Sequence, residues 1–331
     1  MAMTQVATAE TPNAATDPRI DPQIRPFLAD LNRDSSPFWT LPGPQVRAVL
    51  TGLQAKTPVD MSGVAITEKT ITGNGQTVKL YIMKPANARD SLPVVLFIHG
   101  GVWIAGDFDN HKRLVRDIVV DSGAAAVFVE YTPIPDAVFP TQLEQSYAAA
   151  QWVAQHGSEA NLDGSRIAVA GNSVGGNMSA ALALLAKERG GPSLRLQVLL
   201  IPATNASVDT DSYRSFDTGR FLARDFMKFG WDIYAPGAAA RKDPHVSPLQ
   251  ATVEQLRGLP PALVITAEND PLRDEGEAYA RMLKEAGVDV IATRYNGQIH
   301  DFVLLNALQK VPGVQAAIRQ TSEEIRRRLS P

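Results

Sequence analysis

Apolar runs of strand length alternate with helix-length stretches over most of this chain. The strand-like runs lie at 94–98, 125–129, 166–170, 194–201, 262–266 and 288–295. The helical stretches lie at 111–120, 143–156, 177–189, 275–286 and 314–329. The runs at 94–98 and 125–129 are continuously apolar, as in strands that are covered on both faces. This alternation predicts an α/β fold with a mostly parallel central sheet and helices on both of its faces.

Two segments near the N-terminus depart from this alternation. Strand patterns at 64–67 and 78–82 flank Thr72-Gly73-Asn74-Gly75, which predicts a β-hairpin at an antiparallel edge of the sheet. Such an edge strand offers a surface through which a homodimer could pair. Before the hairpin, residues 20–54 carry apolar anchors at helical spacing, interrupted by prolines. This segment cannot form a core alone, so we expect it to pack on another part of the molecule.

A long insertion separates the strand ending near 202 from the strand beginning at 262. Its aromatic-rich helical stretch contains Phe221, Leu222, Phe226, Met227, Phe229, Trp231 and Tyr234. The stretch is either a helix packed on the body of the domain or a lid over the carboxyl ends of the strands, where sites in α/β sheets lie. We favour the lid, with the N-terminal segment as its packing partner. The expected divisions are a tail at 1–19, an N-terminal cap segment at 20–60, a core at 61–204 and 242–331, and a cap insertion at 205–241.

Composition narrows the possible partners. The formal net charge of −3 over 331 residues shows no basic excess, so we expect no nucleic-acid partner. No stretch approaches the roughly 18 uninterrupted apolar residues of a membrane span, so we expect no membrane insertion. The lack of cysteine excludes disulfides, thiolate metal sites and a cysteine nucleophile. Residues 1–19 lack the apolar core of a signal peptide, so we expect a flexible tail on a cytoplasmic protein, with a previously removed export signal as the alternative.

The stretch Gly171–Gly176 is the candidate centre of the chemistry. A β-branched run enters it and an Ala/Leu-rich helical run leaves it, which places Ser173 on a sharp strand-to-helix turn, the setting of a nucleophile elbow. Gly171 and Gly175 remove Cβ atoms that would crowd such a turn.

A serine hydroxyl is a weak nucleophile and needs a base, which in turn needs an orienting acid. In folds with this elbow the chain order is serine, acid, histidine, and only His245 and His300 follow Ser173. His300 follows the last predicted strand, where a base is expected. Asp270 is the first aspartate after the strand at 262–266, and Pro271 restricts it to an extended conformation that suits a fixed acceptor. We therefore expect Asp270 to orient His300.

The oxyanion of an acyl-transfer intermediate needs backbone N–H donors placed in advance. The glycine-containing turn His99-Gly100-Gly101-Val102-Trp103 follows a predicted strand and can supply them, together with the N–H of Val174.

Taken together, these motifs resemble those of the bacterial hormone-sensitive-lipase-like esterases. They are His99–Trp103, Glu130–Pro133 with Phe139-Pro140, Gly171–Gly176, Asp270–Glu275 and Tyr295–Phe302. The resemblance implies an α/β-hydrolase core with a helical cap, no cofactor, and hydrolysis of small esters with short or medium acyl chains. It also implies that Ser173 is the nucleophile, His300 the base and Asp270 its partner. The implied oxyanion donors are Gly101, Val102 and Val174.

Four positions depart from the pattern that is usual in this family. Val102 stands in place of Gly, Asn172 in place of an acid, Val174 in place of Ala and Asp301 in place of Gly. Val102 is expected to add bulk near the reacting carbonyl and to disfavour esters of bulky alcohols. A carboxylate at Asp301 is expected to stabilise the protonated imidazole and raise the pKa of His300.

The expected substrate pocket contains Phe38, Trp39, Trp103, Phe226 and Trp231. Two other functions stay open, namely amide or peptide hydrolysis by the same triad and small-molecule binding without catalysis. No histidine pair has metal-ligand spacing, and Gly171–Gly176 does not match the dinucleotide-binding pattern.

Overall fold

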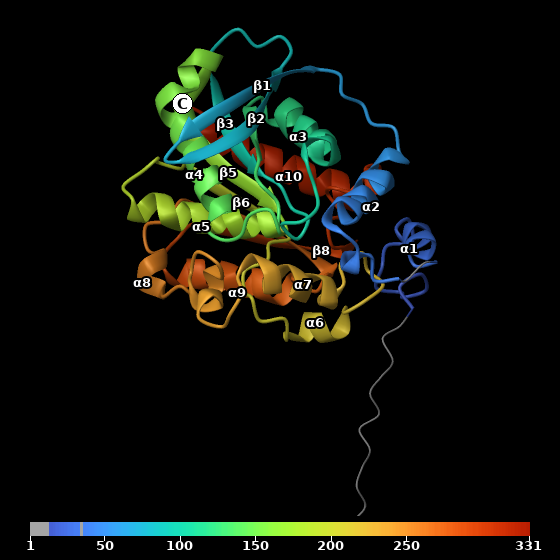
Figure 1. The fold of residues 1–331 in the computed structure, drawn as a ribbon. Helices are drawn as coiled ribbons and strands as arrows, with labels where there is room; N and C mark the ends of the chain where they lie inside the picture. Colours follow the sequence, from blue (N-terminus) through green and yellow to red (C-terminus); the bar gives the residue numbers. More distant parts are fainter. Residues whose placement is uncertain (1–12, 34–35) are drawn as a thin grey trace, which may run out of the picture.

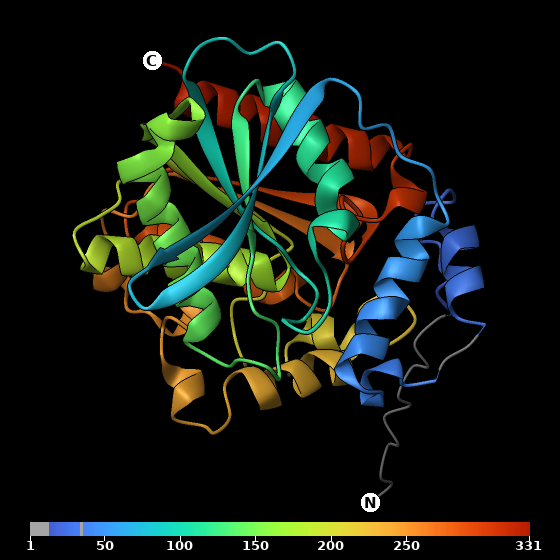
Figure 2. The same cartoon turned by 45° about the horizontal axis from the view of Figure 1, so that its top comes forward.

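The computed structural model describes residues 13–33 and 36–331 and contains one eight-stranded sheet in the order β1-β2-β4-β3-β5-β6-β7-β8 (Figures 1 and 2). The strands are β1 (Val64–Gly73), β2 (Gln76–Pro85), β3 (Leu92–Ile98), β4 (Ala125–Glu130), β5 (Leu162–Asn172), β6 (Leu196–Leu200), β7 (Ala262–Asn269) and β8 (Val290–Ile299). Strand β2 runs antiparallel to β1 and β4, and every other pairing is parallel. The predicted α/β fold with a mostly parallel sheet is therefore confirmed.

Helices cover both faces of the sheet. On one face lie α3 (Phe108–Ser122) and α10 (Pro312–Leu329), which pack against each other and against side chains such as Val95 and Phe97. On the other face lie α4 (Thr141–His156), α5 (Val174–Glu188) and α9 (Arg273–Glu285). Successive residues of a strand point to opposite faces, so the continuously apolar strand β3 serves both cores at once.

The hairpin has the predicted edge position. Its turn is Asn74-Gly75, where both residues have positive φ (53° and 73°), as in the turns that match strand twist. Strand β1 is one edge of the sheet and β8 is the other.

The cap has two parts that lie side by side (Figure 1). The N-terminal part contains α1 (Arg25–Leu31), the 3-10 turn η1 (Phe38–Thr40) and α2 (Gly43–Ala55), and the insertion contributes α6 (Asp211–Ser215) and α7 (Arg224–Tyr234). Pro26 and Pro44 lie in the first turns of α1 and α2, where the missing N–H costs little, so these two prolines begin helices. The remaining short elements are η2 (Gly157–Ala160), η3 (Ala240–Lys242), η4 (Pro248–Gln250), α8 (Val253–Leu256) and η5 (Asn306–Leu308).

Gln54 joins the N-terminal cap part to the far end of the chain. Its buried Nε2 donates to the carbonyls of Asn110 and Leu304, at 2.7 and 3.1 Å, and its Oε1 accepts the N–H of Asn306 at 2.9 Å. Both polar ends of the side chain are therefore satisfied across about 250 residues of sequence separation.

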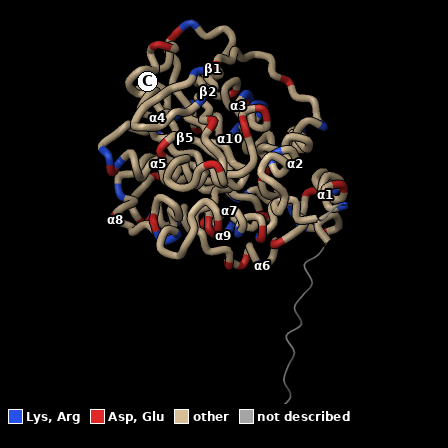
Figure 3. The backbone as a smooth tube through the Cα atoms, viewed as in Figure 1, with Lys and Arg blue, Asp and Glu red and all other residues tan. Residues whose placement is uncertain are grey.

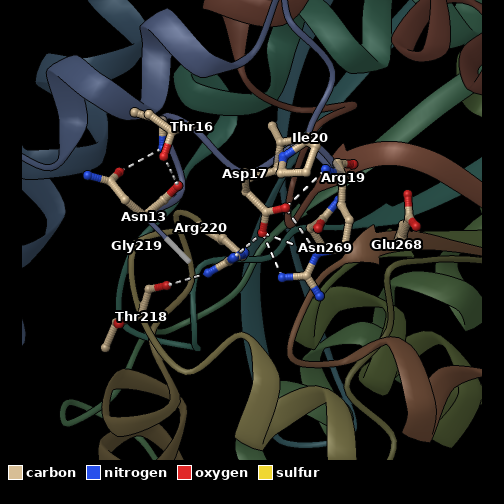
Figure 4. A network of polar contacts seen from close by, with 12 residues as sticks. Asn13, Thr16, Asp17, Arg19, Ile20, Thr218, Gly219, Arg220, Glu268 and Asn269 are labelled. Carbon is tan, nitrogen blue, oxygen red and sulfur yellow. Dashed lines mark hydrogen bonds and ion pairs between the residues drawn. The ribbon is translucent and has the colours of Figure 1, made fainter. Parts of the chain in front are cut away.

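The expected tail at 1–19 is too long. Residues 1–12 lie outside the described residues, but Asp17 is buried and pairs with Arg19 and with the buried Arg220 of the insertion, each at 2.7 Å (Figure 4). Asn269 donates to the carbonyl of Arg19 at 3.1 Å. Residues 13–19 therefore fasten the cap insertion to the end of β7. A short polar segment gives no apolar periodicity, so the sequence pattern did not distinguish it from a tail.

Acidic and basic residues are interspersed along the described chain (Figure 3). None of the helices described for residues 13–33 and 36–331 is long and apolar enough to cross a membrane.

Candidate active site

Ser173 lies on a strained turn between β5 and α5. Its φ and ψ are 55° and −122°, a region that L-residues seldom occupy. The flanking glycines are required by close packing, as predicted: a Cβ on Gly175 would lie 2.0 Å from the carbonyl oxygen of Ile98, and one on Gly171 would lie 2.4 Å from the backbone of Gly175. Strand, turn and neighbouring loop therefore approach one another only because side chains are missing there.

The structure brings Ser173, His300 and Asp270 together from three different loops. His300 Nε2 lies 3.0 Å from Ser173 Oγ, and His300 Nδ1 lies 2.8 Å from Asp270 Oδ2. All three side chains are buried. Asp270 follows β7 and accepts the N–H of Leu272 at 2.8 Å, which fixes the carboxylate. This geometry allows a proton to pass from the serine to the imidazole while the carboxylate holds the ring.

The charges around His300 favour its protonated form. Burial alone lowers the pKa of His300, but the carboxylates of Asp270 and Asp301 and the hydrogen bond to Asp270 outweigh burial, so the pKa is raised. The other candidate, His245, lies between Asp243 and Glu188, at 3.0 and 2.9 Å, beside the C-terminal end of α5. It is not brought to Ser173.

The loop after β3 turns sharply beside Ser173. Gly101, Val102 and Trp103 have positive φ in succession (111°, 55° and 58°), and a Cβ on Gly101 would lie 2.1 Å from the carbonyl oxygen of Ala105. Within residues 13–33 and 36–331, no protein acceptor takes the N–H of Gly101 or Val102. Val174 is the first residue of α5, a position whose N–H has no partner inside the helix. The three expected oxyanion donors are therefore free to bind a substrate oxygen.

Val102 contacts the cap. Its side chain is buried, and its Cγ1 lies 2.2 Å from the point where a Cβ on Gly230 of α7 would stand. The bulk that was expected near the reacting carbonyl is thus accommodated, at this atom, by the missing side chain of Gly230. The sequence offered no signal for this pair, because the two residues are far apart in the chain.

A cavity of about 1030 Å³ opens beside the triad. Its lining includes Ser173, His300, Gly101 and Val102, and the two cap parts contribute Phe38, Trp39 and Phe226. The ring of Phe226 lies 5.1 Å from that of Phe38 and stacks at 5.7 Å on that of Trp39. The expected contact between the N-terminal segment and the insertion is therefore present, directly over the site.

Two of the expected pocket residues are placed elsewhere. Trp103 and Trp231 are fully buried and do not line this cavity. Trp103 stacks on Tyr234 at 4.0 Å and packs against Trp231 at 4.5 Å, so the two indoles form the joint between α7 and the loop after β3. Residues that the sequence did not single out, such as Ala105 and Ala223, line the cavity instead.

Among the described residues, no group of three or more His, Asp or Glu side chains could hold a metal ion. The rings of the buried histidines His99 and His111 lie 5.3 Å apart, and both contact Phe128 in the core. Burial lowers the pKa of His99 to about 4, and its ring stacks on Tyr131 at 4.0 Å.

Comparison with known proteins agrees with this geometry. A protein family described as alpha/beta hydrolase fold matches residues 95–304. The carboxylesterase NlhH of Mycobacterium tuberculosis is 36% identical over 319 residues, which cover 94% of this chain and 97% of the relative. An ethyl acetate hydrolase of Pseudomonas putida is 33% identical over 264 residues, 79% of this chain and 81% of the relative.

A solved structure gives the same result. The crystal structure of a thermostable esterase from Pseudomonas putida ECU1011 superposes with a TM-score of 0.94 at 54% identity, covering 95% of this chain and 99% of that one. The fold and motif resemblance are thereby confirmed. The chain belongs to the α/β-hydrolase family, in its group of hormone-sensitive-lipase-like carboxylic ester hydrolases.

Proposed function

We propose that this chain hydrolyses carboxylic esters through an acyl-enzyme on Ser173. The observation that carries the proposal is the continuous chain of contacts from Asp270 through His300 to Ser173, at 2.8 and 3.0 Å. It supports a nucleophile, a base and an orienting acid in the geometry that acyl transfer requires.

In the first half-reaction, Ser173 Oγ attacks the ester carbonyl carbon while its proton moves to His300 Nε2. The carbonyl oxygen becomes an oxyanion and accepts hydrogen bonds from the N–H groups of Gly101, Val102 and Val174. The intermediate then collapses, the bond to the alcohol oxygen breaks, and Nε2–H protonates that oxygen. The alcohol leaves, and the acyl group stays on Ser173.

In the second half-reaction, water takes the place of the alcohol. His300 removes a proton from the water, whose oxygen attacks the acyl carbon, and the oxyanion forms again at the same donors. Collapse breaks the bond to Ser173 Oγ, which takes the proton back from Nε2. The carboxylic acid is released, and the enzyme returns to its starting state.

We propose short- to medium-chain acyl esters as the substrates. The cavity of about 1030 Å³ is lined by Ser173 and by aromatic side chains, which suit an apolar acyl group. One relative is named an ethyl acetate hydrolase, and a related esterase was crystallised in complex with (S)-Ac-CPA. Both names refer to small molecules.

A homodimer paired at a sheet edge and a cytoplasmic location also stay predictions.

Amide or peptide hydrolysis by the same residues is the second candidate, because the triad and the oxyanion donors serve both reactions. Rates on an ester and an anilide with the same acyl group separate the two. Small-molecule binding without catalysis is less consistent with the site, since the base His300 is present and in contact with Ser173.

The decisive experiment compares the wild type with Ser173→Ala on p-nitrophenyl acetate, butyrate and octanoate. The serine variant is expected to lose activity, and an organophosphate is expected to label Ser173 in the wild type only. Ser165→Ala, at an exposed position of β5, is the matched control and should keep both activity and labelling. Full activity in Ser173→Ala would overturn the proposal.

A further inference from the structure

Asn172 and Asp301 are in direct contact beneath the triad. Asn172 is the last residue of β5, directly before the nucleophile, and Asp301 directly follows the base. Asn172 Nδ2 donates to Asp301 Oδ1 at 2.8 Å, and both side chains are buried. The two departures that the sequence showed separately therefore form one hydrogen-bonded pair.

The amide of Asn172 is fixed at both ends. Its Oδ1 accepts the N–H of Gly100 at 3.0 Å, which leaves Nδ2 as the group that faces Asp301. A buried amide that donates with one end and accepts with the other cannot rotate without losing both bonds. Asn172 thus ties the Asp301 carboxylate to the loop that carries Gly101.

The second oxygen of Asp301 faces the reacting edge of the base. Asp301 Oδ2 lies 3.7 Å from His300 Nε2, the nitrogen that also lies 3.0 Å from Ser173 Oγ. Asp270 lies at the opposite nitrogen, 2.8 Å from Nδ1. The imidazole therefore stands between two carboxylates, one at each nitrogen.

Asp301 occupies this place at a cost to the fold. Its φ is 55°, in the left-handed region that favours glycine, which is the unfavourable part. The turn is held by its carbonyl oxygen, which accepts the N–H groups of Leu304 and Leu305. Burial raises its pKa, although His300 and the hydrogen bond from Asn172 oppose that rise. Local costs of this kind are typical of residues kept for function.

We propose that Asp301 is a positioning residue that holds a second negative charge at the Nε2 edge of His300 while the imidazole carries the serine proton, and that Asn172 fixes this carboxylate in place. The inference rests on the proposed function. Among residues 13–33 and 36–331, the carboxylates that pair with His300 are those of Asp270, from the loop after β7, and Asp301, and Ser173 faces it from the elbow. His111 of α3, which lies close to Asn172, and His99 both have a lowered pKa because they are buried, so they add no positive charge.

The test is the pH profile of kcat/KM on p-nitrophenyl acetate for the wild type and Asp301→Asn. The asparagine keeps the shape and a hydrogen bond to Asn172 but removes the charge. Loss of a carboxylate near the imidazole lowers the pKa of His300, so the acid limb is expected to move to lower pH by about one unit or more. We expect kcat at the plateau to fall by about tenfold.

Asp274→Asn is the matched control. This carboxylate lies in the first turn of α9, pairs with Arg273 at 2.8 Å and accepts the N–H of Ser212. It contacts neither His300 nor Ser173, so its removal should leave the acid limb unmoved.

The double variant Asn172→Asp/Asp301→Asn tests whether the position of the negative charge matters. It keeps one carboxylate, one amide and the hydrogen bond between them, but moves the charge to the side of the pair that faces Gly100. We expect thermal stability near that of the wild type and an acid limb shifted as in Asp301→Asn. If Asp301→Asn fails to fold, as judged by circular dichroism, the acid limb of this double variant alone decides whether the inference holds.

An acid limb that stays in place in the variants that fold overturns the inference and leaves the pair a structural role only. The proposed function fails separately, if Ser173→Ala stays active. Loss of activity in Ser173→Ala together with an unmoved acid limb in Asp301→Asn therefore rejects this inference and keeps the esterase.

Discussion

The bulky side chain of Val102 fits against Gly230, which has no side chain. Val102 Cγ1 lies only 2.2 Å from the position that a Cβ on Gly230 would take. The first residue belongs to the loop that carries two of the three proposed oxyanion donors, and the second lies in the cap helix α7. The cap and the donors are therefore adjusted to each other at this contact.

Gly230→Ala is expected to lower kcat on p-nitrophenyl butyrate by about tenfold or more, because the new Cβ would displace Val102 and the donors beside it. In an ordinary helix interior the same change stabilises by about 0.5–1 kcal/mol. Activity should return in part in Gly230→Ala/Val102→Ala, which makes room for the methyl group. If Gly230→Ala were fully active and more heat-stable, the contact between Val102 and Gly230 would not constrain the loop.

Asp270→Asn is expected to lower kcat by about 10⁴-fold, because the amide no longer selects the tautomer of His300 that accepts the serine proton. In the wild type the raised pKa of His300 places the acid limb of kcat/KM above pH 6.5, since only the neutral imidazole accepts a proton. A steady-state pH series measures both effects. Asp274→Asn is again the control, and comparable losses in both variants would contradict a specific role for Asp270.

Phe226→Ala is expected to shift the acyl-chain preference toward longer chains. Phe226 contacts Phe38 and Trp39 where they line the cavity, so its removal opens the wall. We expect the ratio of kcat/KM for octanoate to that for acetate to change by about tenfold, a typical size for altered apolar contact. Phe229→Ala lies on the same helix but does not line this cavity, and it should leave the ratio near that of the wild type. Equal changes in both variants would show that Phe226 does not determine the acyl-chain preference.

Asp17→Asn is expected to lower the free energy of unfolding by about 3–5 kcal/mol, because it removes the buried carboxylate that pairs with the Arg220 guanidinium at 2.7 Å. The pKa of Asp17 is lowered in the folded protein, chiefly by its hydrogen bond with Arg19 against the effect of burial. Its contribution is therefore complete above the unfolded pKa of about 4 and is lost as the pH falls below that value.

Urea unfolding at pH 7 and at lower pH checks the Asp17 prediction. Asp30→Asn is the control, since its pair with Arg33 is exposed on both sides (72% and 80%) and should be worth less than about 1 kcal/mol. A loss of similar size in both variants would refute the role of burial.

The sequence predicted the parts of the site that depend on local pattern. Ser173 was found from glycines around a strand-to-helix turn, and Asp270 and His300 from their positions after strands. Their distances agree with that expectation because parallel strands deliver their carboxyl ends to one edge of the sheet. The packing of the N-terminal segment on the insertion was expected, but most contacts between particular side chains across the fold were not predicted.

Trp103 and Trp231 illustrate this limit. Trp103 was expected in the pocket from its motif and Trp231 from the aromatic stretch of the insertion. The two indoles instead pack on each other and on Tyr234, because apolar rings gain more from mutual burial than from lining an opening. Asp17 illustrates the reverse case, a polar residue whose partner lies 203 positions away. Asn172 and Asp301 were each noted, but only the fold makes them a pair.

The bonds of Gln54 set the order in which the molecule can be completed. Gln54 is made early in synthesis, but its partners Leu304 and Asn306 come from the last part of the chain. These bonds therefore cannot form until the chain up to Asn306 has left the ribosome. Contacts of such long sequence separation form slowly, so we expect this attachment of the N-terminal cap segment to be a late step of folding. A nascent chain that stalls before residue 304 holds its nucleophile without the finished cavity.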